Sequence, residues 1–196
     1  AESSTVAVPQ ADAPPEIDLV PAAARTMRRL VMHMTEVPLG SSPAQLPLQG
    51  AVAILGEGPI ASALQSILAP LGQPVHVLSD ANAETAMQQL TTLWQAGPIP
   101  HLFVLSASES TTESNSVGTM PGSERMLRNF QIIQKWLELV EKNDLVKRSS
   151  LAAVTSMGGD FSFASASSNL LAGGITGLLK ALRRECDGLR VKVLDI

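Results

Sequence analysis

The chain has 196 residues, of which 45% are hydrophobic, and it is therefore long enough to bury one sizeable core. Its 14 basic and 18 acidic residues give a net charge of −4, without the basic run that a nucleic-acid-binding protein needs. The single cysteine, Cys186, excludes an internal disulfide, and no apolar run is long enough to cross a bilayer. Since the N-terminus also lacks a signal-peptide pattern, we expect a cytoplasmic protein whose cysteine is an ordinary thiol.

The N-terminal part divides into two segments. Residues 1–21 are small, polar and proline-bearing, contain no Lys or Arg, and are predicted to be a linker between domains. Residues 22–50 are predicted to hold an early strand and a connector, because Leu30, Met32 and Met34 alternate with other side chains before Pro38. His33 in that strand has no acid or cysteine at ligand spacing, so we expect no metal site. The remaining residues, 51–196, are expected to form one domain.

The domain opens with a predicted strand–helix–strand unit. Ala51–Leu55 is a short apolar run typical of a parallel strand buried on both faces. The next residues, Gly56 to Ala61, read G-x-G-x-x-A, a variant of the fingerprint of dinucleotide-binding folds. Val75–Leu78 is the predicted second strand. Between the strands, four apolar residues recur at helical spacing and predict a helix: Ile60, Leu64, Ile67 and Leu68.

Two interpretations of the glycine loop remain open. A nucleotide site would use Gly56, Gly58 and Ala61 at the phosphates, with Asp80 at the ribose. However, Pro59 removes a backbone N–H and Glu57 places a carboxylate where an anion would bind. The glycines also suit a tight turn, and Asp80 could equally be the N-cap of the next helix. We therefore expect no cofactor in this chain.

The rest of the chain continues to alternate helices and strands. Helices are predicted over Ala83–Ala96, Ser123–Asn143 and Leu170–Arg184, and strands over His101–Leu105, Leu151–Thr155 and Val191–Asp195. The buried stripe of the second of these helices is predicted to be Met126, Phe130, Ile133, Leu137 and Val140, thickened by Trp136. A long polar loop, Ser106–Gly122, precedes that helix. This alternation predicts an α/β fold with a parallel sheet and three layers, of the Rossmann-like type.

The residues that a short-chain reductase needs are incomplete. Such an enzyme places a serine after the strand that corresponds to Leu151–Thr155, a tyrosine about a dozen residues later as proton donor, and a lysine that lowers the phenol pKa. Ser156 stands at the serine position, but Asn169 occupies the tyrosine position and the chain contains no tyrosine at all. Lys180 lies too far along the helix. The other possible donors, His76 and His101, are not predicted at the carboxyl ends of strands, where ligands bind in such sheets. We expect no catalytic residue.

The order of segments resembles the structural subdomain of ketoreductase domains in polyketide synthases and polyunsaturated-fatty-acid synthases. The stretches that carry the resemblance are the early strand at residues 28–38, the glycine loop at 56–61, Gly158-Gly159-Asp160-Phe161, the Gly173–Glu185 stretch with GLLKALRRE, and Val191–Asp195. They span nearly everything after the predicted linker.

The resemblance implies a truncated Rossmann-like half of short-chain-reductase type with no chemistry of its own. In the family, this half supports a second one that binds NADPH and reduces a 3-oxoacyl thioester on an acyl carrier protein. The chain is expected to end about where that catalytic half would begin. The implied partners are the catalytic half, the other synthase domains and, indirectly, the carrier protein. The alternative is a nucleotide-binding reductase or nucleotide-sensing module, which would use Gly56, Gly58, Ala61 and Asp80, with Ser156 at the substrate.

Overall fold

The computed structural model describes residues 48–78, 82–106, 121–163 and 170–196, which all belong to the second of two units into which the chain divides, Glu36–Ile196. The predicted linker, the early strand at residues 28–38, Asp80 and Asn169 lie outside the described residues. The elements are β1 (Val52–Leu55), α1 (Pro59–Leu68), η1 (Ala69–Leu71), β2 (Val75–Leu78), α2 (Ala83–Ala96), β3 (His101–Leu105), α3 (Pro121–Lys142), η3 (Val146–Arg148), β4 (Ser150–Thr155), α4 (Leu170–Glu185) and β5 (Arg190–Asp195). Each strand boundary lies within one residue of its prediction.

The strands form one parallel sheet, as the sequence predicts. The strand order is β2-β1-β3-β4-β5, and every neighbouring pair is parallel. The chain moves outward from β1 to β2 and then crosses back over β1 to β3, so the direction of winding reverses between β1 and β3. In open α/β sheets, ligands bind at such a reversal, beyond the carboxyl ends of the strands.

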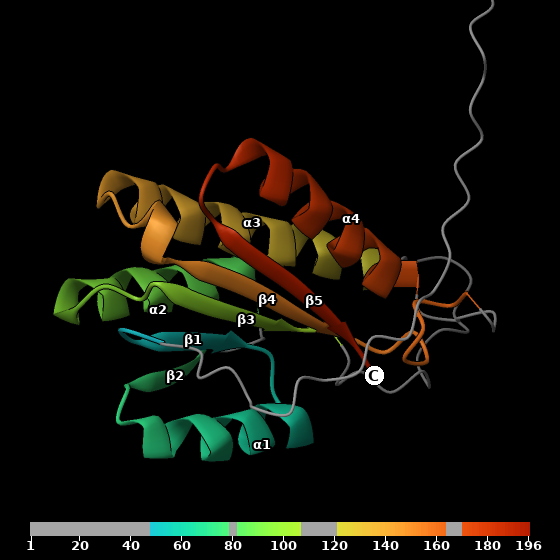
Figure 1. Cartoon of the computed structure of the whole chain (residues 1–196), viewed down its shortest axis with the longest axis horizontal. Helices are drawn as coiled ribbons and strands as arrows, with labels where there is room; N and C mark the ends of the chain where they lie inside the picture. Colours follow the sequence, from blue (N-terminus) through green and yellow to red (C-terminus); the bar gives the residue numbers. More distant parts are fainter. Residues whose placement is uncertain (1–47, 79–81, 107–120, 164–169) are drawn as a thin grey trace, which may run out of the picture. The chain divides into compact units, whose positions relative to one another are not determined.

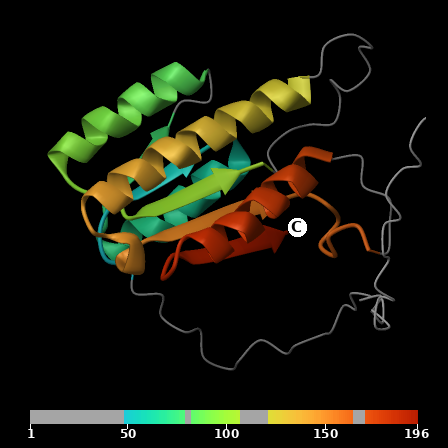
Figure 2. The same cartoon turned by 90° about the horizontal axis from the view of Figure 1, so that it is seen from above.

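Helices cover the two faces of the sheet unequally. In Figures 1 and 2, α2, α3 and α4 lie on one face, whereas α1 lies on the other. The four residues of β1 are at most 1% exposed and divide between these layers. Ala53 and Leu55 join the core beneath α2, α3 and α4, and Val52 and Ile54 join the core beneath α1. An all-apolar strand is the sequence signature of this two-sided burial, which confirms the interpretation of Ala51–Leu55.

Two apolar side chains that the sequence pattern places in the core are exposed instead. Phe130 on α3 is 43% exposed and Ile67 on α1 is 69% exposed. The rest of the predicted stripe of α3 is confirmed, since Ile133, Trp136 and Val140 are buried and Met126 and Leu137 are partly buried against the same core. The buried face extends to Asn129 and Ile132 instead of Phe130. Helical spacing allows either neighbour at the margin of the stripe, and the packing of the helix decides between them. The helix also begins two residues before its predicted start, at Pro121.

Trp136 anchors α3 to the chain that enters β3. Its side chain has 0% exposure, and its indole Nε1 donates a hydrogen bond to the backbone oxygen of Ile99 at 2.8 Å. Ile99 is itself fully buried, so this carbonyl has no access to water. A buried tryptophan usually finds such a partner for its N–H group, and here the partner lies 37 residues away in the chain. In the described part of the chain, no helix is long and apolar enough to span a membrane.

We predict that Trp136→Phe lowers the free energy of unfolding by about 1–3 kcal/mol, because it leaves the buried Ile99 carbonyl without its donor and removes packed ring volume. Trp94→Phe is the matched control, since Trp94 is only partly buried and packs at the border of the same core. Urea unfolding followed by circular dichroism measures both variants. An equal loss in the two variants would contradict the anchoring role of Trp136.

Candidate functional site

Four segments of the candidate site lie at one edge of the sheet, at the carboxyl ends of β1, β3, β4 and β5. Gly56 follows β1, Ser106 follows β3, Ser156 follows β4, and Asp195 ends β5. Each segment touches the next. Gly56 packs against Leu105, the Ser106 amide and hydroxyl both donate to the Val154 oxygen at 2.9 and 3.0 Å, and the Thr155 hydroxyl donates to Asp195 at 2.9 Å. The topology thus assembles an edge from segments that are as much as 139 residues apart (195 minus 56).

The two glycines of the loop after β1 are required by the backbone itself. Gly56 has a φ of 122°, and a Cβ there would lie 2.9 Å from the Leu105 Cβ and 3.1 Å from the Leu105 oxygen. Gly58 has a φ of 93° and is the N-cap of α1. Residues with a side chain rarely adopt either φ. The glycine pattern is therefore explained by the turn and by the close approach of β3, without any ligand.

The loop fits the pyrophosphate of a dinucleotide poorly. A helix start binds an anion through backbone N–H groups that are not yet used within the helix. In α1 the first helical position is Pro59, which has no N–H, and the Ser62 amide already donates to the Gly58 oxygen at 3.1 Å. Only the amides of Ile60 and Ala61 remain in the first turn, and the exposed Glu57 carboxylate precedes them. A negatively charged residue beside so few donors disfavours a second anion.

Asp80, the predicted ribose-binding residue, lies outside the described residues, but its alternative role is wrong. The N-cap of α2 is Asn82, whose side-chain oxygen accepts a hydrogen bond from the Thr85 amide at 2.8 Å. Asn and Asp are equally good N-caps. The helix begins at Ala83, so the capping position falls on Asn82, two positions after Asp80.

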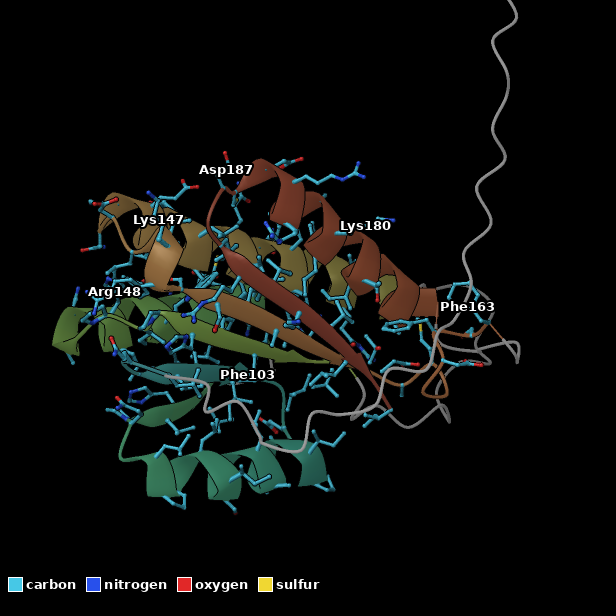
Figure 3. All side chains as sticks on the ribbon, viewed as in Figure 1. Phe103, Lys147, Arg148, Phe163, Lys180 and Asp187 are labelled. Atoms are coloured by element: carbon cyan, nitrogen blue, oxygen red, sulfur yellow. The ribbon has the colours of Figure 1, made fainter. Side chains whose placement is uncertain are left out.

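Four of the residues considered for a reductase mechanism lie in the described part of the chain: Ser156, Lys180, His76 and His101. Ser156 is half-buried immediately after β4, the position expected for a reductase serine. Lys180 is exposed on α4, as expected for a solvated face, and points away from the sheet in Figure 3. His76 lies within β2, and His101 begins β3 at the opposite edge. Burial lowers the pKa of His101, the Gln49 backbone opposes that shift, and Arg190 adds to it. His101 is therefore a neutral core residue.

The most highly hydrogen-bonded side chain at this edge was not predicted as a site residue. One carboxylate oxygen of Asp195 accepts from the Thr155 hydroxyl at 2.9 Å and from the Met157 amide at 2.6 Å, and the other accepts from the Phe161 amide at 2.9 Å. Burial opposes ionisation of Asp195, but the hydrogen bonds from Phe161, Met157, Thr155 and Gly159 outweigh it and lower the pKa of this carboxyl. Asp195 is therefore a stable anion.

A sequence signal for this role did exist. An acid placed at the carboxyl end of a parallel strand lies beside the loop that follows the neighbouring strand. That loop contains Gly158-Gly159, and glycines at positive φ let successive backbone N–H groups converge on an anion. Recognising it from sequence requires knowing that β4 and β5 are neighbours, which the chain order suggests but does not determine.

Three further features were considered as possible sites: clusters of metal-ligating side chains, the Cys186 thiol and a surface hollow. Among the described residues there is no cluster of three or more His, Cys, Asp or Glu side chains that could hold a metal ion. Burial raises the pKa of the Cys186 thiol, and Glu141 and Glu185 raise it further, which disfavours the reactive thiolate. A surface hollow of about 410 Å³ lies between the N-terminal ends of α2 and α3. Its lining, which includes Asn82, Arg125 and Arg128, contains none of the predicted site residues.

Comparisons with known proteins identify the fold. No family model and no curated protein matches the sequence. Among solved structures, a short-chain dehydrogenase from Leptospira borgpetersenii, determined with bound NAD+, matches with a TM-score of 0.57 and 17% identity, over 84% of this chain and 76% of that one. A short-chain dehydrogenase/reductase from Serratia marcescens matches with a TM-score of 0.51 and 14% identity over 75% and 74% of the chains. A UDP-glucose 4-epimerase from Thermotoga maritima gives 0.53 and 14% over 73% and 54%.

The chain has the fold of the short-chain dehydrogenases. At identities this low, the likeness extends to the fold alone. The likeness confirms the predicted α/β class. It also gives a reason to ask whether the chain contains the tyrosine that a short-chain reductase uses. A chain without tyrosine cannot supply the phenol that the reductase mechanism described above requires.

We predict that Gly56→Ala destabilises the protein by about 1–3 kcal/mol, because the new Cβ overlaps Leu105 and the backbone must keep a positive φ. Gly97→Ala is the control, since Gly97 has an extended φ and a Cβ there meets nothing within 4 Å. Thermal unfolding of the two variants gives the comparison. A loss for Gly56→Ala no larger than that for Gly97→Ala would show that the loop tolerates a side chain.

Proposed function

We propose that this chain is the structural half of a ketoreductase domain in a cytoplasmic polyketide or polyunsaturated-fatty-acid synthase. The observation that carries the proposal is a short-chain-dehydrogenase fold in a sequence with no tyrosine. A scaffold needs the sheet and its helices but no proton donor. The poor phosphate loop at Glu57 and Pro59 supports the same conclusion, because a half that binds no cofactor has no need of a complete anion cradle.

The stretches that resemble the ketoreductase family occupy parts of the fold that a scaffold must keep. GLLKALRRE lies in α4, whose residues Ile175, Leu179 and Leu182 are buried against the sheet. Val191 and Val193 of β5 pack against the same core. The Gly158–Phe161 stretch is the loop that Asp195 holds. In this proposal, the partner half binds NADPH and reduces a 3-oxoacyl thioester carried by an acyl carrier protein.

A second candidate function is a nucleotide-binding reductase or a nucleotide-sensing module. It is favoured by the glycine loop, since Gly56 and Gly58 have the positive φ values that bring a backbone close to a phosphate. The structurally similar dehydrogenase from Leptospira borgpetersenii has NAD+ bound. For this chain, the site would be Gly56, Gly58 and Ala61 with Asp80, and Ser156 would contact the substrate.

We predict no saturable binding of NADPH or NADH up to about millimolar concentration, because only two first-turn amides face an anion beside Glu57. Nicotinamide fluorescence during a titration of the full chain measures it. Micromolar binding that is lost in Ser62→Glu, a change at an exposed position near the start of α1, would refute the scaffold proposal and support the second candidate. Binding that Ser62→Glu leaves unchanged would place the nucleotide outside the glycine loop and refute both functions as described here.

We predict that replacing Met32 and Met34 together with Glu weakens association with the catalytic half at least about tenfold, because charge on the apolar side of the predicted early strand must be desolvated in an interface. The chain and the catalytic half are co-expressed, and their association is measured by co-purification and light scattering. Ile67→Glu is the control, since that apolar side chain is 69% exposed on α1. Unchanged association in the double variant would exclude the early strand from the interface.

A further inference from the structure

The loop after β4 closes around a single carboxylate. The amides of Met157 and Phe161 donate to different oxygens of Asp195, at 2.6 and 2.9 Å. Gly158 and Gly159 between them have φ values of 95° and 81°, so the backbone turns continuously around the charge. The Met157 and Phe161 amides are four residues apart and converge on the carboxylate from one loop. We call this concavity the nest, by analogy with the successive backbone amides that bind anions in many proteins.

The sheet delivers the carboxylate to a fixed position. Asp195 pairs with Thr155 in the β4–β5 register, and the Ile196 amide donates to the Thr155 oxygen at 3.0 Å on the far side of the pair. The Thr155 side chain has 0% exposure, and its hydroxyl donates to the same carboxylate at 2.9 Å. The β4–β5 register therefore places this carboxylate beside Thr155, where the loop after β4 begins.

The loop contains backbone strain next to its contacts with Asp195. Phe161 and Ser162 are consecutive non-glycine residues at φ values of 54° and 61°. Each such residue is unfavourable and persists where its surroundings over-determine it. Within the loop, the Ser162 amide donates to the Met157 oxygen and the Phe163 amide to the Asp160 oxygen, both at 3.2 Å. The shorter bonds, at Met157 and Phe161, lead to Asp195.

We propose that Asp195 is the permanent internal ligand of an anion-binding nest, and that this carboxylate sets the shape of the loop and the position of Ser156 and Phe163 at the carboxyl edge. The amides of Met157 and Phe161 are therefore already used by the chain itself. They are closed to a substrate oxygen or a phosphate. A small free carboxylate such as formate has the same chemistry as the Asp195 side chain and takes its place once that side chain is removed.

The test compares Asp195→Ala with the wild-type chain and with Asp187→Ala. Asp187 is exposed and lies at the amino end of β5, at the opposite end of the sheet from the labelled Phe163 in Figure 3. Amide hydrogen exchange at Met157 and Phe161 is measured by NMR, and sodium formate is then added up to about 0.5 M with sodium chloride at the same ionic strength as the control for screening.

We expect exchange at Met157 and Phe161 to be at least about tenfold faster in Asp195→Ala, to return towards the wild-type rate saturably with formate, and not to respond to chloride. Asp187→Ala should match the wild type with either salt. Continued protection of both amides in Asp195→Ala, or equal effects of formate and chloride, would overturn the proposal.

Asp195→Asn keeps the side-chain shape and covers the case in which Asp195→Ala does not fold. An amide group has one acceptor oxygen and one donor nitrogen, so it can accept from only one side of the nest. One of the two amides, Met157 or Phe161, should then lose its protection while the other keeps it. Protection of both in Asp195→Asn would show that a negative charge is not what the loop requires.

Discussion

The burial of β1 on both faces is the constraint on which the rest of the structure depends. Its four apolar residues contribute alternately to the core under α2, α3 and α4 and to the core under α1. A strand of this kind must have helices on both sides and strands at both edges. The βα units that follow supply them, β2 at one edge and β3 at the other. The reversal of winding between β1 and β3 then creates the ligand-binding position typical of such sheets.

At that position, the chain retains the architecture of a binding site but few of its chemical groups. Gly56 lacks a side chain where β3 comes too close to leave room for one. Pro59 is the first residue of α1 and has no backbone N–H to donate to an anion. Ser156 keeps its place after β4, and the sequence has no phenol to work beside it. These two features, the sparse donors at the start of α1 and the absence of tyrosine, are the ones on which the scaffold proposal rests.

At the same edge, the Asp195 side chain takes up backbone amides that could otherwise bind a ligand. In many α/β proteins, backbone amides at this edge bind a ligand. Here, a side chain at the end of β5 occupies the amides of the loop after β4, and its pKa is lowered by the hydrogen bonds that result. The loop is thereby tied to the sheet through a neighbouring strand.

The sequence by itself determined the fold class and the element boundaries, because local patterns encode them: the apolar run of β1, the glycines that need a positive φ, and the helical spacing of α2 and α4. It also determined that no tyrosine could act, since composition does not depend on conformation. Only the tertiary structure decided that Ile132 and not Phe130 belongs to the buried face of α3, because helical spacing allows both. Only the tertiary structure revealed the role of Asp195. Its partners Met157 and Phe161 are 38 and 34 residues away in sequence, and the pairing of β4 with β5 is what brings them within hydrogen-bonding distance.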